Sequence, residues 1–415
     1  RQGRGRIAVG HDCRTTSEDY NARVLDGLTA SGLDVIDIGV CSTPVSYFSI
    51  RHLELDGSVM VTASHNPPDY NGFKICSGVD SVYGDALQEI LGLIQEEDFT
   101  SGSGTVEQTD IYTPYLAYLK KNISVSKPLR VGIDAGNGTA GPAAVAAVKA
   151  QGCVVTDIYT EMDGSFPNHE ADPTVAANMA DLVDLVAREK LDVGLAFDGD
   201  GDRIGVVDAD GSLIYGDQLM ILFSREILGR KPGATFISEV KCSQTLYDDI
   251  EKNGGVAIMW KTGHSLIKKK MKAVQAELAG EMSGHMFFAD RYFGFDDALY
   301  AALRLLEILA DTGKTIGQLL ADVPPTFNTP EIRVACPDKV KFDVVAQVTD
   351  HFRQREEVID IDGVRVLFGD GWGLVRASNT QPALVLRFEA LSEARLEEIR
   401  RTVETCLDDV IARVG

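Results

Sequence analysis

The sequence has 415 residues, 44% of them hydrophobic and 25% charged, which is typical of a globular protein too long for a single domain. Its formal net charge of −22 argues against nucleic acid or an anionic membrane as a partner, although a local basic site could still bind a small anionic substrate. Seven scattered cysteines without a C-x-x-C pair, no signal peptide and no apolar stretch near the roughly 20 residues of a membrane helix favour a cytoplasmic protein with reduced thiols.

Strand and helix patterns alternate from the N-terminus, which indicates a mostly parallel sheet. The predicted strands are 6–10, 33–39 and 57–63, and the predicted helices are 17–32 and 83–95. The third strand would end at Ser64. The polar, Gly- and Ser-rich segment 99–110 is typical of a linker.

The alternation of strand and helix patterns begins again after this segment. The next predicted elements are strands at 129–134, 191–197 and 204–211, and a helix at 142–152. A third unit begins after Gly211 and holds strands at 234–240 and 255–260. Closely spaced strands then lead to an amphipathic helix at 392–414, so the last domain is expected to be α+β.

The first loop that could carry chemistry is TASHNPPDYNGFK, residues 62–74. A serine at the carboxyl end of a strand, here Ser64, lies where open α/β sheets bind ligands. Two prolines stiffen the loop, and Gly72 permits a turn before Lys74. We expect Ser64 to accept or carry a phosphoryl group with His65 and Lys74 nearby; the alternative is an ordinary turn rich in Asn, Pro and Gly.

The second loop is FDGDGDR, residues 197–203. Glycines let Asp198, Asp200 and Asp202 converge, and two such charges about 4 Å apart repel by about 4 kcal/mol at an effective dielectric constant of 20. A cation removes this cost, and carboxylate oxygens suit Mg²⁺. The pattern therefore predicts a metal site, with Arg203 able to reach the same phosphate; the alternative is an acidic turn.

The third loop is AGEMSGHMFF, residues 279–288. Glu281, Ser283 and His285 alternate across flexible glycines, so the loop could present a carboxylate and a hydroxyl to neighbouring sugar hydroxyls. A β-turn whose polar side chains only face solvent is an equal alternative from these residues alone.

The fourth loop is VRASNTQP, residues 375–382. Its Arg376, Ser378, Asn379 and Thr380 are all good donors to phosphate. The alternative is that these residues form only the polar end of a hairpin in an α+β domain.

Two further stretches could support a site for an anion. Lys241 directly follows a predicted strand, and His264 begins a predicted helix, where backbone N–H groups favour anions. The lysines that follow on this helix are expected to form a solvated face: Lys268, Lys269, Lys270 and Lys272.

In this order, the four loops resemble those of the α-D-phosphohexomutase superfamily, closest to its bacterial phosphomannomutase/phosphoglucomutase branch. WKTGHSLIKKKM and RYFGFDDALY are similar to that branch too. The resemblance covers essentially the whole chain and implies three similar α/β domains with mixed sheets, followed by a smaller α+β C-terminal domain, around a central cleft. The domains expected are 1–108, 109–211, 212–325 and 326–415.

The resemblance also implies an activity. Phospho-Ser64 would convert hexose 1-phosphate and hexose 6-phosphate, of mannose and/or glucose, through a 1,6-bisphosphate, with glucose 1,6-bisphosphate as activator. One Mg²⁺ per chain would be held by Asp198, Asp200, Asp202 and a phosphate oxygen on Ser64. The protein would act as a cytoplasmic monomer without nucleic-acid or membrane partners.

The resemblance assigns roles to the other residues of the loops. The catalytic residues besides Ser64 would be Lys74, Arg203 and His285, with Lys74 near the transferring group. The substrate contacts would be Lys241, His264, Glu281, Met282, Ser283, Gly284, His285, Arg376, Ser378, Asn379 and Thr380. His285 and Lys74 are the candidates for proton transfer.

Rival functions are a phosphoglucosamine mutase, a serine-phosphate phosphatase and a non-catalytic phosphosugar-binding protein. Met282 stands where the phosphoglucosamine branch usually has glutamine, and the intact Ser64 and aspartates argue against a mere sensor. The family segment built around Tyr-Asp-Ile-Arg-Gly, which supplies an active-site arginine, has no counterpart in this sequence. Arg14, in GHDCRTTS, is not expected to take that role.

Overall fold

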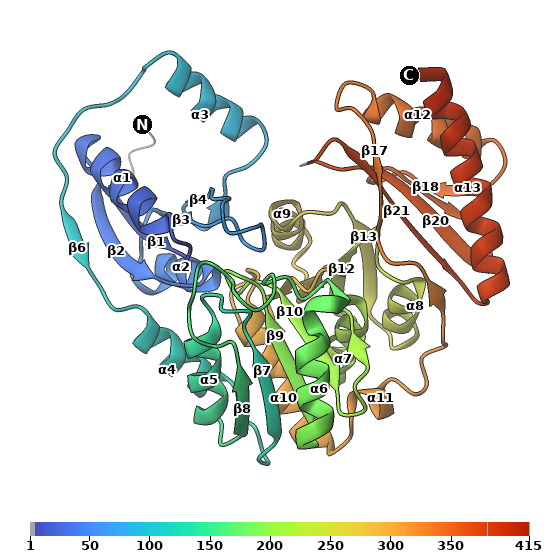
Figure 1. Ribbon diagram of the computed structural model, residues 1–415, viewed down its shortest axis with the longest axis horizontal. Helices are drawn as coiled ribbons and strands as arrows, with labels where there is room; N and C mark the ends of the chain where they lie inside the picture. The colour runs from blue at the N-terminus through green and yellow to red at the C-terminus, as the bar shows by residue number, and fades with distance from the viewer. Residues whose placement is uncertain (1–4, 380, 415) are drawn as a thin grey trace.

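The computed structural model describes residues 5–379 and 381–414, which form four sheets with helices packed against them (Figure 1). The first sheet has the order β5-β4-β3-β1-β2-β6. Its strands are β1 (Arg6–His11), β2 (Asp34–Val40), β3 (Gly57–Val61), β4 (Phe73–Ser77), β5 (Asp80–Ser81) and β6 (Val106–Gln108). The helices of this region are α1 (Ser17–Ala30), α2 (Thr43–His52) and α3 (Asp85–Gln95).

The second sheet has the order β11-β10-β9-β7-β8. Its strands are β7 (Arg130–Asp134), β8 (Val154–Ile158), β9 (Val193–Phe197), β10 (Ile204–Asp208) and β11 (Leu213–Ile214). The helices here are α4 (Tyr112–Asn122), α5 (Gly141–Ala150), α6 (Ala180–Glu189) and a 3₁₀ turn, η1 (Ala176–Met179).

The third sheet has the order β13-β12-β14-β15. Its strands are β12 (Thr235–Glu239), β13 (Val256–Trp260), β14 (Leu278–Gly280) and β15 (Met286–Phe288). The helices here are α7 (Gly216–Arg230), α8 (Gln244–Lys252), α9 (His264–Val274), α10 (Ala298–Thr312) and α11 (Ile316–Leu319).

These three sheets repeat one topology. In each domain the first strand, β1, β7 or β12, is central and pairs in parallel with the second and the third. The third strand then pairs antiparallel with the fourth. The hairpin between the third and fourth strands therefore occupies the same place in each domain. Those hairpins are residues 62–72, 198–203 and 281–285, which are the first three loops singled out in the sequence.

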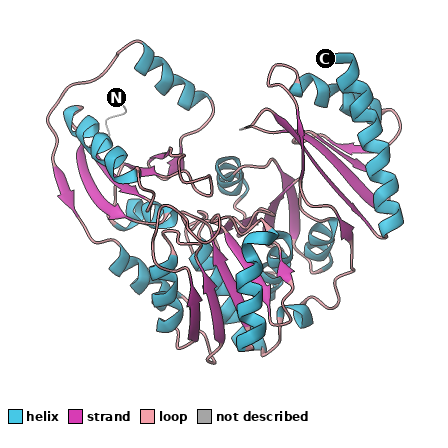
Figure 2. Cartoon of the chain, viewed as in Figure 1, coloured by secondary structure: helices cyan, strands magenta, loops and turns pink. Residues whose placement is uncertain are grey.

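The C-terminal domain is one antiparallel sheet with both of its helices on one face (Figure 2). Its strands are β16 (Phe327–Asn328), β17 (Ile332–Ala335), β18 (Glu357–Ile359), β19 (Val364–Leu367), β20 (Gly371–Ala377) and β21 (Ala383–Ala390). Its helices are α12 (Lys341–Arg353) and α13 (Glu393–Val414). The fourth predicted loop is the turn between β20 and β21. The expected fold class, three α/β domains followed by an α+β domain, is confirmed.

The other face of this sheet docks on the third domain. Side chains alternate across a strand, so Val375 and Ala377 join the domain's own core while Trp372 and Leu374 pack against Val240. Two buried arginines on this face, Arg365 and Arg387, donate hydrogen bonds to backbone oxygens that follow β12: Val240, Cys242 and Lys241.

One continuous apolar core runs through the first three domains, whereas the C-terminal domain has its own. Helix α10 joins the second and third domains because it contacts β9, β10 and β15. Asp297 caps its N-terminus by accepting from the backbone N–H of Tyr300, and Gly313 ends it in a left-handed conformation, with φ of +64°. No helix among the described residues is long and apolar enough to cross a membrane.

Two sequence predictions need correction at their boundaries. Strand β3 ends at Val61 and not beside Ser64: Thr62 keeps one hydrogen bond to the Gly72 carbonyl, and a turn from Ala63 to Asn66 then carries Ser64. The segment 99–110, predicted as a linker, contains β6, which pairs with β2 at the edge of the first sheet. Hydrogen bonds from Thr105 to Asp34 hold β6 there, a contact that composition alone does not reveal.

Candidate active site

Ser64 lies in the hairpin loop of the first domain in a conformation rare for residues other than glycine, with φ of +54°. Its backbone N–H donates to Thr62 Oγ1 at 2.9 Å. Its hydroxyl donates to Asp198 Oδ2 of the second domain at 3.0 Å and lies 3.2 Å from His65 Nδ1. Gly199 lies so close to the Ser64 carbonyl that a side chain there would collide with it. The left-handed turn thus directs the serine hydroxyl into the neighbouring domain's acidic loop.

Arg14 holds the loop that carries Ser64 through hydrogen bonds to its backbone. Its guanidinium donates to backbone oxygens of Ser64, Asn66, Pro67 and Tyr70, at 2.7, 2.5, 2.6 and 3.2 Å. Asp12 pairs with its Nε at 3.2 Å, and both side chains are buried. Arg14 is therefore a positioning residue for the loop, a role that sequence reasoning missed.

Asp198, Asp200 and Asp202 are all fully buried, and they offer one oxygen each within 4.8 Å of one another. Burial and the charges of Asp202 and Asp200 raise the pKa of Asp198 well above its usual value. One oxygen of the cluster, Asp200 Oδ1, has no hydrogen-bond partner among the described residues. Three converging carboxylates with an unsatisfied buried oxygen fit a hard divalent cation.

Two groups from the first domain contact the same cluster. Lys74, on β4, pairs with Asp200 at 2.6 Å and with Asp202 at 2.5 Å. Although burial opposes it, these carboxylates raise the pKa of the Lys74 ammonium above its usual value. Thr43, at the N-terminus of α2, donates from its backbone N–H to the Asp200 carbonyl at 2.8 Å. The ammonium therefore stays charged within the acidic cluster.

His285 connects the second and third loops. Its Nδ1 lies 2.7 Å from Glu281 Oε2, and its Nε2 lies 3.0 Å from Asp202 Oδ1 and 3.2 Å from Arg203 Nε. Burial lowers its pKa, but Asp202 and Glu281 outweigh this and raise the pKa of His285 to about 10. These two carboxylates therefore favour the protonated form of His285.

Glu281 is fixed by the segment that precedes α9. Gly263 N–H donates to Glu281 Oε1 at 2.7 Å. Burial would raise the pKa of this carboxyl, but His285 and Lys241 hold it lower, at about 2. Next to it, Met282 N–H donates to the fully buried Glu239, which also accepts from the Thr262 hydroxyl at 2.5 Å.

Asp296 is a second buried acid that faces the site. It lies 3.4 Å from His264 Nδ1 and accepts from Lys268 Nζ at 3.0 Å, and the His264 ring stacks on His285 with centroids 5.9 Å apart. Burial and Lys268 lower the pKa of His264. Lys268 is mostly buried, so the expectation of a solvated face is wrong for this lysine; Asp296 and the ring of Tyr47 cover it.

The fourth loop, residues 375–382 of the C-terminal domain, is linked to the third domain by Arg376 and Asp362. The Nε of Arg376 pairs with Asp362 at 3.0 Å, and Asp362 accepts from Thr262 N–H at the same distance. Lys241 pairs with Glu331 at 3.0 Å. Asn379 is exposed, and Thr380 lies outside the described residues.

Comparison with known proteins connects this geometry to a family. Phosphoglucomutase/phosphomannomutase alpha/beta/alpha domains I, II and III match residues 1–101, 113–211 and 215–327, and the C-terminal domain of the same family matches 331–405. The chain belongs to the phosphoglucomutase/phosphomannomutase family. The resemblance drawn from the four loops is thereby confirmed.

Individual relatives support the same assignment. A phosphomannomutase/phosphoglucomutase of Pseudomonas aeruginosa is 46% identical over 395 residues, 95% of this chain and 85% of that protein. A phosphoglucomutase of Neisseria gonorrhoeae is 43% identical over 415 residues, 98% of this chain and 89% of that protein. The crystal structure of a phosphoglucomutase/phosphomannomutase family protein from Burkholderia thailandensis gives a TM-score of 0.94 at 41% identity, covering all of this chain and 91% of that one.

Within this phosphoglucomutase/phosphomannomutase fold, direct contacts with the three aspartates bring together the predicted residues Ser64, Lys74 and His285. Arg376 is linked to them only indirectly, by hydrogen bonds through Asp362 and Thr262. Sequence reasoning missed a second group of partners, all buried except the partly exposed Asp362: Arg14, Thr43, Glu239, Asp296 and Asp362. Asp296 had a detectable signal, because two adjacent aspartates in the apolar sequence RYFGFDDALY imply at least one buried carboxylate.

Proposed function

We propose that Ser64 carries the phosphoryl group in a reversible conversion of hexose 1-phosphate and hexose 6-phosphate, of mannose and/or glucose, through a 1,6-bisphosphate. The observation that supports this most directly is the hydrogen bond from the Ser64 hydroxyl to Asp198, one of three buried carboxylates of which another, Asp200, pairs with Lys74. A phosphoryl group on this hydroxyl would lie next to the acidic cluster, so its charge would have to be offset by a cation.

The three aspartates would hold one Mg²⁺, together with a phosphate oxygen on Ser64. When bound, the ion neutralises charge on the phosphoryl group. Arg203, whose Nε lies 4.0 Å from Asp198, supplies a second positive charge from the chain itself.

The first transfer forms a bond from phosphorus to a sugar oxygen and breaks the bond from phosphorus to Ser64 Oγ. The second transfer forms the bond to Ser64 Oγ again and breaks the bond from phosphorus to the other phosphorylated sugar oxygen. In the first transfer the serine oxygen must gain a proton, which protonated His285 or Lys74 can donate, while the sugar hydroxyl must lose one. We assign its acceptance to His264, which a lowered pKa keeps neutral. In the second transfer the roles reverse: the group that lost its proton takes one from the Ser64 hydroxyl, and protonated His264 returns its proton to the departing sugar oxygen.

The substrate would be held by the other loops. Glu281 and Ser283, with Met282, Gly284 and His285 around them, would bind sugar hydroxyls. Lys241, Arg376, Ser378, Asn379 and Thr380 would bind the phosphate that is not being transferred. Glucose 1,6-bisphosphate would act as activator because it can phosphorylate Ser64. We further propose a cytoplasmic monomer.

Phosphate mapping combined with kinetics tests this function. Purified protein is assayed with glucose 1-phosphate, mannose 1-phosphate and glucosamine 1-phosphate, with Mg²⁺ and a trace of glucose 1,6-bisphosphate. We expect one phosphate on Ser64 by intact mass and peptide mapping, no turnover by Ser64→Ala, and normal turnover by the exposed control Ser103→Ala. Full activity of Ser64→Ala would overturn the proposal, and a preference for glucosamine 1-phosphate would favour the rival mutase.

A further inference from the structure

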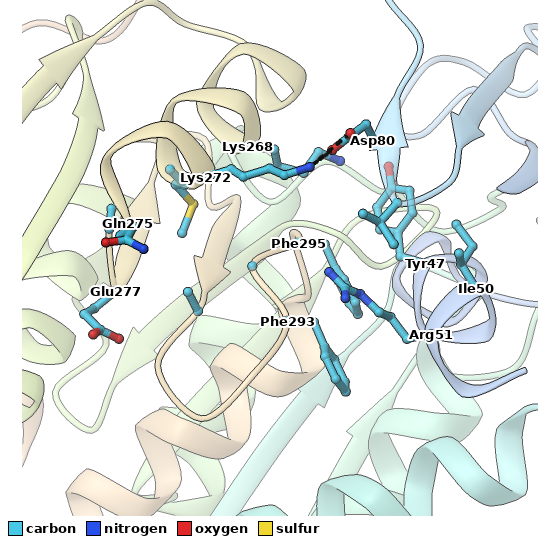
Figure 3. A pocket seen from close by; sticks show the side chains of 15 residues that line it. Tyr47, Ile50, Arg51, Asp80, Lys268, Lys272, Gln275, Glu277, Phe293 and Phe295 are labelled. Atoms are coloured by element: carbon cyan, nitrogen blue, oxygen red, sulfur yellow. Dashed lines mark hydrogen bonds and ion pairs between the residues drawn. The ribbon is translucent and has the colours of Figure 1, made fainter. Parts of the chain in front are cut away.

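A cavity of about 410 Å³ lies between the first and third domains, outside the proposed active site (Figure 3). Its walls come from α2, the turn before β5, α9 and the segment 289–295. None of the residues assigned above to catalysis, metal or substrate lines it. Its size falls in the range of pockets that bind small organic molecules, roughly 300–1,000 Å³.

One cation of the lining, the solvent-exposed Arg51, has no counter-charge among the described residues. Arg51, on α2, has its guanidinium 6.0 Å from the ring centre of Phe293, and no hydrogen bond or ion pair joins it to any other residue in the described part of the chain. The two acids of the lining are already neutralised: Asp80 by Lys272 at 3.0 Å, and Glu277 by Lys231 at 2.8 Å. The remaining lining cation, Lys268, is bound to Asp296.

The rest of the lining suits a flat apolar body. The rings of Phe293 and Phe295 stack with centroids 5.9 Å apart and planes 16° from parallel. Ile50, Met271 and Ala276 are buried side chains of the same wall. Uncharged hydrogen-bonding side chains are limited to those of Tyr47 and Gln275, which is too few to satisfy the hydroxyls of a sugar.

We propose that this cavity binds a small aromatic carboxylate. The carboxylate pairs with the Arg51 guanidinium, whose planar fork matches two carboxylate oxygens, and the ring packs against Phe293 and Phe295. A monoanion is favoured over a phosphate, because a dianion would need a second free cation and both lysines are already paired. Such a ligand touches α2 of the first domain and the 289–295 segment of the third, so it ties these domains together.

Titration with 2-naphthoate tests the site, using its intrinsic fluorescence. Wild-type protein should bind it saturably, and Arg51→Ala should weaken binding about ten-fold or more, the loss typical of a charge-assisted contact. Ala289→Trp, at an exposed position of the lining, should also weaken binding by filling the cavity. The matched control is Arg23→Ala, an exposed arginine on α1, which should bind like wild type.

Two comparison ligands define the chemical class. The neutral 2-naphthylmethanol should bind more weakly to wild type than 2-naphthoate and be insensitive to Arg51→Ala, and octanoate should bind more weakly than 2-naphthoate. Mutase turnover of Arg51→Ala should equal that of wild type, which shows that the variant is folded. The proposal is overturned if wild type does not bind 2-naphthoate saturably, if Arg51→Ala binds it equally well, or if octanoate binds as tightly.

Discussion

Replacing Arg14 by lysine tests whether the serine loop must be held in place for catalysis. The guanidinium serves four loop carbonyls and Asp12, whereas an ammonium has only three N–H donors, so at least two of these five contacts are lost. At about 1 kcal/mol net for each, Arg14→Lys should lower the free energy of unfolding by about 2 kcal/mol. If the loop shifts by about 1 Å, kcat should fall by up to about 100-fold.

The assay is the formation of glucose 6-phosphate from glucose 1-phosphate, with phosphate on Ser64 measured by intact mass. We expect kcat to fall more than KM rises, because Arg14 contacts the loop and not the sugar. Urea unfolding gives the stability change, and hydrogen exchange at residues 64–70 should become faster. The exposed Arg23→Lys is the control. If Arg14→Lys kept the wild-type kcat, Ser64 would be positioned without the Arg14 guanidinium, and the positioning role of Arg14 would be refuted.

Three further changes test other parts of the site and fold. Asp200→Asn should lower kcat by about 100- to 1,000-fold, since it removes one charge that holds the cation; turnover unchanged by EDTA would contradict a metal site. Arg376→Ala should lower kcat/KM about ten- to a hundred-fold, alike in the forward and reverse directions, because a guanidinium recognises phosphate whichever sugar carbon bears it; a loss in one direction only would assign the loop to one orientation. Arg230 and Lys231 outweigh burial and lower the pKa of Asp290 from 3.8 to about 2. This carboxyl therefore contributes about 2 kcal/mol of stability above its unfolded pKa, lost as pH falls through its folded pKa. The difference in urea stability between wild type and Asp290→Asn should shrink to about half near pH 3, and a pH-independent difference would refute the assignment.

The sequence predicts most of the fold because local patterns specify it. Runs such as RVGID and LAF contain the β-branched and apolar residues of buried strands, and the structure places β7 and β9 there. Strand ends are less well specified: Thr62 and Ala63 have the composition of a strand, but β3 ends at Val61 and the turn that carries Ser64 begins at Ala63. Strand β6 lies in a polar segment because its partner β2, and not its composition, decides its conformation.

The residues of the candidate site also fall into two groups, those predictable from local sequence and those that depend on distant contacts. Asp198, Asp200 and Asp202 lie in one short motif, so their convergence follows from local spacing. The contacts of Arg14 and Asp296 are made with elements far away in the sequence. No local pattern shows that Arg14 will donate to the carbonyls of the Ser64 loop, or that Asp296 will pair with His264. Arg365 and Arg387 belong to this second kind, because an arginine within an apolar strand indicates a buried partner without identifying it.

The repeated topology explains how dissimilar loops come to form one site. In each of the first three domains a parallel strand ends at the same edge and returns through a hairpin, so the hairpin is free to vary without disturbing the crossover helices. The three hairpins supply a serine, three carboxylates, and a glutamate with a histidine. Ser64 to Asp198 joins the first two, and Asp202 to His285 joins the last two. Because each of these bonds crosses between domains, a shift of one domain relative to another breaks the alignment of serine, acidic cluster and histidine together. The reaction therefore depends on how the domains pack, and a ligand such as the one proposed between the first and third domains would act on that packing.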